Sequence, residues 1–395
     1  MPMAIIFTRY HQELTMFITE SFLVLSFTTF LAISASPGIA SDPELVTKLE
    51  QARPAVSGKN GYQALFDLPL SKEEWPDALP KCDRYAQDCL AQAQQNLATY
   101  RNVLPKMEKI WQQQEAAVED LRQYDYFLPQ PGQYNEKKAL PHYATIFMEN
   151  HLHGYRFAAG EHERALRGAC RDANLGLRLL NSHGPMMQSI VSLKIFQRNI
   201  TLLAQMHAEL PPDTPLPADC ETLRPQAAEN LALCPFMYSE WLNIDELTEK
   251  PEWDWTPGNR GKMLGEQFAN YWVWQTKSQQ RYEMNKYCAP EIIAAVARNE
   301  IVMPDIDAKP RYCSPLNVIC KIGQNNFEAS YRYYQGRLLN ANRYLRAFEL
   351  LNHPDAALPP GYSRDGDGLT FTLYPESTKE GAQTITLPLP GSRMK

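Results

Sequence analysis

Apolar residues recur at spacings of three and four along most of the chain, which is the period of one face of an α-helix. This pattern predicts helices over 83–123, with a new helix opening at Pro105, and then over 141–153, 161–180 and 185–210. The last of these segments is apolar on nearly every side. We therefore expect it to lie at the centre of the fold.

The same period continues in the second half of the chain. Further helices are predicted over three ranges: 221–233, 263–285 and 290–299. Residues 234–262 carry no regular pattern and are interpreted as irregular. The clearest helix spans 325–351, where apolar residues alternate spacings of four and three, which predicts a packing seam about 40 Å long. We expect this seam to pack against the apolar helix over 185–210.

After His353 the pattern changes to short β-rich segments, LTFTLYP and QTITLPLP. The Asp-Gly-Asp-Gly at 365–368 favours a tight turn, so a small hairpin is predicted. A calcium loop is disfavoured because Leu369 stands where a third oxygen ligand is needed. The predicted fold class is mainly α, an irregular multi-helix domain with a small C-terminal β-hairpin. The predicted parts are 1–40, an export segment; 41–352, the helical domain; and 353–395, the hairpin and tail.

Near the N-terminus, residues 21–35 form an apolar run of fifteen positions without a charge. A bilayer span needs about 20 residues, so this length is typical of a signal peptide. A Gly-Ile-Ala site at 38–40 predicts cleavage that leaves Ser41 as the mature N-terminus. The alternatives are an uncleaved signal anchor, in which residues 16–35 cross the inner membrane, and a buried N-terminal helix.

Composition narrows the class of protein. Apolar residues make up 44% and charged residues 21%, which excludes disordered and fibrous chains. Thirty prolines against 19 glycines favour helices joined by stiff loops over a glycine-rich cofactor fold. The net charge of −6 disfavours nucleic acid as a partner. Nucleotide-binding, nucleophile-elbow and zinc-protease motifs are absent from the sequence, and no cofactor is expected.

Eight cysteines follow the export segment, and an even number there predicts disulfides in an oxidising compartment. Spacing favours three local pairs and one long-range pair: Cys82–Cys89, Cys220–Cys234, Cys313–Cys320 and Cys170–Cys288. Because eight cysteines allow 105 pairings, the connectivity stays open. No Cys-x2-Cys or His-x3-His spacing indicates a zinc site, so no metal is expected.

Histidines and glutamates gather in one stretch of the chain. They are His142, His151, His153 and His162, with Glu149, Glu161 and Glu163 nearby. Imidazole and carboxylate groups together could bind zinc or act as acid and base. However, His151 and His153 point apart on a helix. The stretch is therefore interpreted as a polar helix end followed by a solvated loop.

Five of the seven tryptophans fall between 241 and 274. Trp253 and Trp255 lie in a proline-bounded loop with Asp254 between them, and on an extended chain they share a side. Aromatic faces beside carboxylates can hold a sugar, a cationic peptide or a protein partner. The candidate binding residues are Trp241, Trp253, Trp255 and Asp254. The alternative is that these rings fill the space between two helical layers.

Three short segments resemble parts of a loose group of uncharacterised exported bacterial proteins that are mainly helical. They are NGYQAL at 60–65, SIVSLKIFQRNITLLAQM at 189–206 and the Arg-Asp-Gly-Asp-Gly hairpin at 364–368. The resemblance implies an exported, helical, bacterial protein. It implies no activity and supplies no catalytic residue.

These observations lead to a functional hypothesis with two alternatives. The leading one is a non-enzymatic, extracytoplasmic binding or interaction protein of a bacterial cell envelope. Its partner would be another envelope protein or polymer, with membrane contact only through the N-terminal segment. The first alternative is an envelope-polymer hydrolase that uses carboxylates near the tryptophan-rich loop. The second is an immunity- or chaperone-type partner protein. A cleft with carboxylates of raised pKa would favour the enzyme.

Overall fold

A computed structural model describes residues 49, 51–52, 55–69, 75–81, 88–130, 141–249, 275–276, 278–304, 318–375 and 381–394, all within the unit 48–395. It describes no side chains at 229, 243–249 and 318–330. Several predictions therefore lie outside the described residues. They concern the export segment 1–40, Cys82, Cys313, the side chain of Cys320, Trp253, Asp254 and Trp255.

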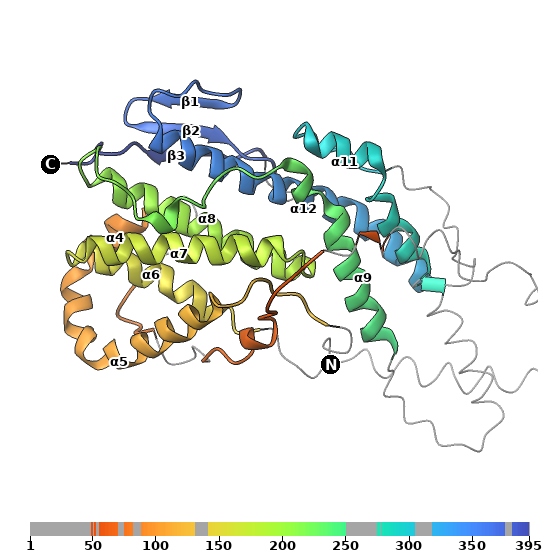
Figure 1. Cartoon of the computed structure of the whole chain (residues 1–395), viewed down its shortest axis with the longest axis horizontal. Helices are drawn as coiled ribbons and strands as arrows, with labels where there is room; N and C mark the ends of the chain where they lie inside the picture. Colours follow the sequence, from red (N-terminus) through yellow and green to blue (C-terminus); the bar gives the residue numbers. More distant parts are fainter. Residues whose placement is uncertain are drawn as a thin grey trace, which may run out of the picture. The chain divides into compact units, whose positions relative to one another are not determined.

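The described part of the chain is mainly helical, as predicted (Figure 1). Its α-helices are α4 (Cys89–Gln95), α5 (Leu97–Leu121), α6 (Ala144–Ala158), α7 (His162–Asn181), α8 (Met186–Ala208), α9 (Leu233–Glu249), α11 (Pro290–Ala297) and α12 (Val318–Asn352). Short 3-10 turns are η2 (Gln63–Leu65), η3 (Ala218–Cys220) and η4 (Ala228–Leu231). Residues 278–286 are also helical.

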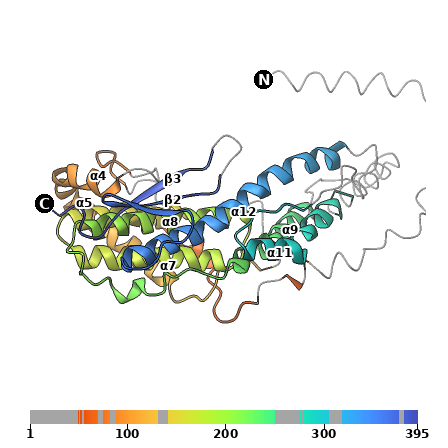
Figure 2. The same cartoon turned by 90° about the horizontal axis from the view of Figure 1, so that it is seen from above.

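Helix α8 lies between α7 and α12, and it also contacts α6, α4 and β3 (Figures 1 and 2). Its side chains are buried on nearly every face, including Phe196, Ile200 and Leu203. A helix that is apolar nearly all round needs cover on several sides. The predicted central position of this helix is confirmed.

Helix α12 packs against α8 through the predicted seam. Leu338 and Leu345 are 1% and 0% exposed, and Tyr331, Ala341 and Phe348 are also buried. The spacing of four and three keeps these residues on one face of the helix, and that face enters the main core. The predicted contact between the two helices is confirmed. The seam does not serve α8 alone, because α12 also contacts η4, β2 and α9 and its Tyr331 packs on Tyr287.

The C-terminal segment forms a three-stranded antiparallel sheet rather than a two-stranded hairpin. The strands are β1 (Tyr362–Asp365), β2 (Gly368–Thr372) and β3 (Thr384–Pro388), in the order β1-β2-β3. The turn from β1 to β2 has Gly366 at its first central position with φ +54°, which is typical of a type II′ hairpin turn. Alternate residues of β2 and β3, such as Phe371 and Leu387, join the main helical core.

Prolines account for most differences between the predicted and observed helices. Pro105 opens no new helix but lies inside α5, which bends in Figure 1, and the break falls at Asn96. Tyr100 and Trp111 stack at 5.8 Å between ring centroids and hold the two sides of Pro105 together. The predicted helix over 221–233 is wrong.

Two further prolines bear on the segments 221–233 and 234–249. Pro225 disfavours helical backbone in the residue before it, and the segment contains only the 3-10 turn η4. Residues 234–249, predicted to be irregular, belong to α9. Pro235 sits in the first turn of α9, where its missing N–H has no partner to lose.

Two disulfides join separate elements. Cys170 of α7 bonds to Cys220 of η3, and Cys234 of α9 bonds to Cys288, with Cα–Cα distances of 5.0 and 4.7 Å. The predicted pairs Cys220–Cys234 and Cys170–Cys288 are therefore wrong, because tertiary packing of helices, not closeness in sequence, brings the sulfurs together. Cys89 is also disulfide-bonded. The paired cysteines indicate an oxidising, extracytoplasmic compartment.

Within the described ranges, none of the helices combines the length and the apolar character that a membrane crossing requires.

Candidate functional site

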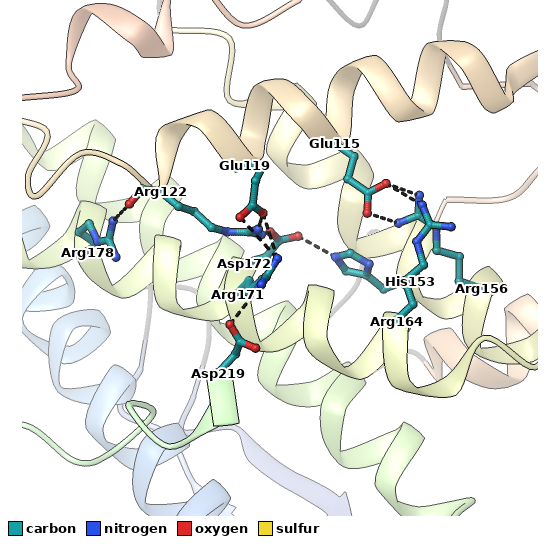
Figure 3. Close-up of polar contacts among 10 residues, drawn as sticks. All are labelled: Glu115, Glu119, Arg122, His153, Arg156, Arg164, Arg171, Asp172, Arg178 and Asp219. Atoms are coloured by element: carbon teal, nitrogen blue, oxygen red, sulfur yellow. Dashed lines mark hydrogen bonds and ion pairs between the residues drawn. The ribbon is translucent and has the colours of Figure 1, made fainter. Parts of the chain in front are cut away.

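Helices α5, α6 and α7 bring a cluster of charged side chains together (Figure 3). Glu149 and His153 are four residues apart on α6, so they share one face of that helix. Asp172 comes from α7, which packs on α6 after a short connection. One ligand atom from each of the three residues lies within 4.8 Å of the others.

All three side chains are buried. Glu149, His153 and Asp172 are 3%, 1% and 0% exposed. His153 Nε2 lies 2.8 Å from Asp172 Oδ2, and Arg122 Nη2 donates a hydrogen bond of 2.8 Å to Asp172 Oδ1. Glu149 Oε1 and His153 Nδ1 are buried without a hydrogen-bond partner. His153 and Asp172 still contact each other, whereas Glu149 contacts neither through a hydrogen bond.

The pKa of Glu149 is consistent with a buried carboxyl group that lacks a partner. Burial is the main reason that the pKa of Glu149 lies well above the ordinary value of 4.5, and the negative charges of Asp172 and Glu115 raise it further. Arg156 and Arg122 act in the opposite direction without cancelling these effects. The site thus disfavours the ionised carboxylate of Glu149 unless a further positive charge is present.

Around this cluster, ion pairs bind each acidic residue to an arginine. Arg156 donates two hydrogen bonds of 2.9 and 2.8 Å to the carboxylate of Glu115, and Arg164 Nη2 donates another of 2.8 Å. Burial would raise the pKa of Glu115, but Arg156 and Arg164 outweigh it and hold that pKa below its usual value. Glu115 is therefore ionised and fully partnered, in contrast to Glu149.

A cavity of about 470 Å³ opens above the cluster. We call it the α5–α7 cavity. Its buried end contains Glu149 and His153, and its outer part contains ion-paired side chains. Each of the four arginines that line it has a carboxylate partner: Arg122 with Glu119 and Asp172, Arg164 with Glu115 and Glu161, Arg167 with Glu163, and Arg171 with Glu119 and Asp219. The uncompensated group in this cavity is thus an acid, which suits a cation.

A glycine lets the His153 ring reach its position. A Cβ atom on Gly168 of α7 would lie 2.3 Å from His153 Cε1 and 2.6 Å from Nδ1. Any larger residue at 168 would force the ring away from Asp172. The cluster therefore depends on close approach of α6 and α7 at this glycine.

The histidine-rich stretch was only partly interpreted correctly. Glu149 and His153 are not at a solvated helix end but in the interior, because α7 covers that face of α6. The other histidines make separate contacts. His142 Nδ1 lies 2.6 Å from the Leu68 carbonyl oxygen, His151 packs beside Trp75, and His162 stacks on Phe157. The spacing of Glu149 and His153 was visible in the sequence, but the contribution of Asp172 was not.

The tryptophan-rich segment is described only in part. Trp241 is partly buried against the main core, and the guanidinium carbon of Arg281 lies 4.4 Å from its ring centroid. Trp253, Asp254 and Trp255 lie outside the described residues. A binding role for this segment stays a prediction, separate from the α5–α7 cavity.

A comparison of the chain with protein-family models, curated proteins and solved structures finds no match. The function is therefore inferred from the geometry of the cavity and from the disulfides.

Proposed function

We propose that this chain is a non-enzymatic binding protein of the bacterial periplasm or cell surface, and that it binds a cationic ligand in the α5–α7 cavity. This proposal rests on the surroundings of the Glu149 carboxyl group. This group is buried, its Oε1 has no hydrogen-bond partner, and it lies at the inner end of a cavity whose arginines are all paired with other acids.

A buried carboxyl group without a partner is costly to the folded protein, by about 1–3 kcal/mol for an unmade hydrogen bond and more if it is charged. A cation that enters the cavity supplies the missing partner. Binding then removes this free-energy cost, and the free energy of binding becomes more favourable by the same amount. A neutral or anionic ligand gains nothing comparable at this position.

The proposed compartment rests on other observations. The cysteines whose side chains are described are all bonded, which supports an oxidising environment. The apolar run at 21–35 and the Gly-Ile-Ala site at 38–40 favour export. The resemblance to exported bacterial proteins favours the periplasm, where the partner would be another envelope component.

A thermal-shift panel tests the proposed ligand class. Spermidine, argininamide and Zn²⁺ would be compared with maltose and citrate on the wild type and on Glu149→Gln, which keeps the shape of the side chain. We expect at least one cation to raise the melting temperature of the wild type and to leave that of Glu149→Gln unchanged. Stabilisation by citrate or maltose alone, or by cations equally in both proteins, would contradict the proposal.

Fractionation tests the proposed compartment. The full chain would be expressed in a bacterium and released by osmotic shock, and free thiols would be alkylated before the fractions are separated. We expect the protein in the shock fluid with its cysteines protected. Recovery in the cytoplasm with reactive thiols would overturn this part of the proposal.

One observation favours the hydrolase as a second candidate function. A carboxyl group with a raised pKa next to a second acidic group is an arrangement that general acid catalysis uses, and Glu149 beside the arginine-paired Asp172 fits it. The site differs from the tryptophan-rich loop that the sequence suggested. Release of soluble sugars or peptides from purified cell-wall polymer by the wild type, lost in Glu149→Gln, would favour this function over binding alone.

A further inference from the structure

We infer that Glu149, His153 and Asp172 form a binding site for a divalent transition-metal ion of the Zn²⁺ class. The inference rests on the proposed function and names its ligand, because it assigns the cation to the inner end of the α5–α7 cavity. No metal was expected from the sequence, since its cysteine and histidine spacings match none of the common zinc motifs.

The separations of the three groups suit one shared ion. In the tetrahedral geometry typical of zinc, two ligand atoms at about 2.1 Å from the ion lie about 3.4 Å apart. His153 Nε2 and Asp172 Oδ2 lie 2.8 Å apart, so these two atoms would separate by about 0.6 Å around the ion. One ligand atom from each of Glu149, His153 and Asp172 lies within 4.8 Å of the others, so a rotation of the Glu149 side chain would bring a carboxylate oxygen to the ion. The ion then takes the place of the proton between His153 and Asp172.

An independent observation points to a missing ligand at this place. Glu149 is 3% exposed, and its Oε1 has no hydrogen-bond partner. Buried polar atoms in folded proteins are nearly always partnered, so each exception calls for an explanation. A metal ion explains this one, because it gives the carboxylate both a bond and a compensating positive charge.

The surrounding contacts support the ligands in the way metal sites require. Arg122 holds Oδ1 of Asp172 and leaves Oδ2 directed at His153. Gly168 leaves room for the imidazole ring against α7. Such outer contacts fix the orientation of metal ligands and tune their affinity. Arg122 also pairs with Glu119, so its positive charge does not by itself neutralise the acidic groups of the cluster.

The donor set indicates the kind of metal. One imidazole nitrogen and two carboxylate oxygens suit Zn²⁺ and its first-row neighbours, whereas Mg²⁺ and Ca²⁺ prefer oxygen ligands alone. Three protein ligands leave a fourth position free. That position faces the α5–α7 cavity, because Glu149 and His153 both line it. A small anionic or neutral ligand could complete the coordination there.

Burial favours a bare ion over an organic cation. The three side chains are between 0% and 3% exposed. An alkylammonium or guanidinium group is far larger than a metal ion and would stay in the outer part of the cavity, where the carboxylates are already paired with arginines. Zn²⁺ can reach Glu149 directly.

Isothermal titration calorimetry tests the inference on the full, untagged, disulfide-bonded protein after removal of metals with a chelator. ZnCl2 would be titrated into the wild type, Glu149→Gln, His153→Ala and the control Glu108→Gln, which changes an exposed carboxylate of α5 outside the cavity. We expect one Zn²⁺ per chain in the wild type and control, and affinity weakened about 100-fold in the two cluster variants. Mg²⁺ should bind far more weakly than Zn²⁺.

Circular dichroism of each variant shows whether it is folded, and the Zn²⁺-dependent rise in melting temperature gives a second readout. Equal Zn²⁺ binding by wild type and a folded Glu149→Gln variant would overturn the inference. If Zn²⁺ fails to bind the wild type but spermidine stabilises it through Glu149, the metal inference is wrong and the proposed function stands. If neither Zn²⁺ nor an organic cation binds, both are wrong.

Discussion

Replacing Gly168 with alanine tests the geometry of the cluster without removing any of its polar groups. The added methyl carbon would lie 2.3 Å from His153 Cε1, a distance that real Cβ contacts essentially never show. The ring also contacts Asp172, one turn further along α7, with Nε2 at 2.8 Å from Oδ2. His153 must therefore rotate and lose this contact.

The expected cost follows from two opposing effects. A buried hydrogen bond to a charged group contributes about 1.5–3 kcal/mol. Alanine inside a helix is more stable than glycine by about 0.5–1 kcal/mol, which offsets part of the loss. Gly168→Ala should thus lower the free energy of unfolding by about 1–2 kcal/mol.

Gly154→Ala is the matched control, because Gly154 is the neighbour of His153 in α6. A Cβ atom there would meet Ala93 Cβ at 3.6 Å and Leu202 Cδ1 at 3.7 Å, which are ordinary van der Waals contacts. The helix preference should then dominate and raise the free energy of unfolding by up to about 1 kcal/mol.

Urea denaturation followed by circular dichroism would compare these two variants, His153→Ala, and the double variant His153→Ala/Gly168→Ala. With the imidazole ring removed, the alanine at 168 should no longer destabilise, so the two changes should be strongly non-additive. If Gly168→Ala is as stable as the wild type, or if it costs the same in the His153→Ala background, the described contact between His153 and α7 is wrong.

Four other predictions test the fold and the export of the chain. Leu338→Ala should cost about 2–5 kcal/mol in denaturant unfolding, because Leu338 is 1% exposed in the seam between α12 and α8. Non-reducing peptide mapping should find Cys170 bonded to Cys220, and replacing both with serine should lower stability by at most about 4 kcal/mol. Burial raises the pKa of Glu240 above 4.5, so the folded protein keeps a proton that the unfolded chain has lost. The free energy of unfolding should therefore fall as pH rises from 4.5 through the raised pKa, by up to about 1.4 kcal/mol per pH unit. Glu240→Gln should flatten this part of the plot of stability against pH. N-terminal sequencing of the exported protein should begin at Ser41, and a start at residue 1 or 16 would leave the signal-anchor alternative.

Hydrophobic periodicity predicted the helices that carry the core. Helix α8 was placed at the centre because its residues are apolar on nearly every side, and the seam of α12 was evident from unbroken spacings of four and three. Both signals are local and strong. The same reasoning failed at Pro105, which was given too much weight, since tertiary contacts decide whether a helix tolerates a proline. It also failed at 234–249, where no regular apolar pattern marks α9.

Long-range pairing could not be predicted from one sequence. Strand β1 alternates exposed and partly buried residues at the edge of its sheet, so it carries no apolar run. The link between Cys170 and Cys220 depends on how η3 docks on α7. Each of these contacts joins segments whose proximity exists only after folding.

The candidate site could be predicted from the sequence only in part. Glu149 and His153 share a helix face by their spacing of four, which the sequence displays. Asp172 joins them only because α6 and α7 pack side by side, and Gly168 matters only because the His153 ring lies against it. A glutamate four residues before a histidine on a predicted helix was the available signal.

The central claim is that Glu149 lacks a compensating partner until a cation binds. The most direct test compares the free energy of unfolding of the wild type and Glu149→Gln at pH 7, with chelator and no added cation. Because glutamine keeps the shape but cannot become charged, we expect the variant to be more stable at pH 7, by about 1.4 kcal/mol for each pH unit between 4.5 and pH 7 over which burial keeps Glu149 protonated in the folded protein. A variant less stable than the wild type would mean that Glu149 already has a favourable partner in the free protein, and would contradict this account.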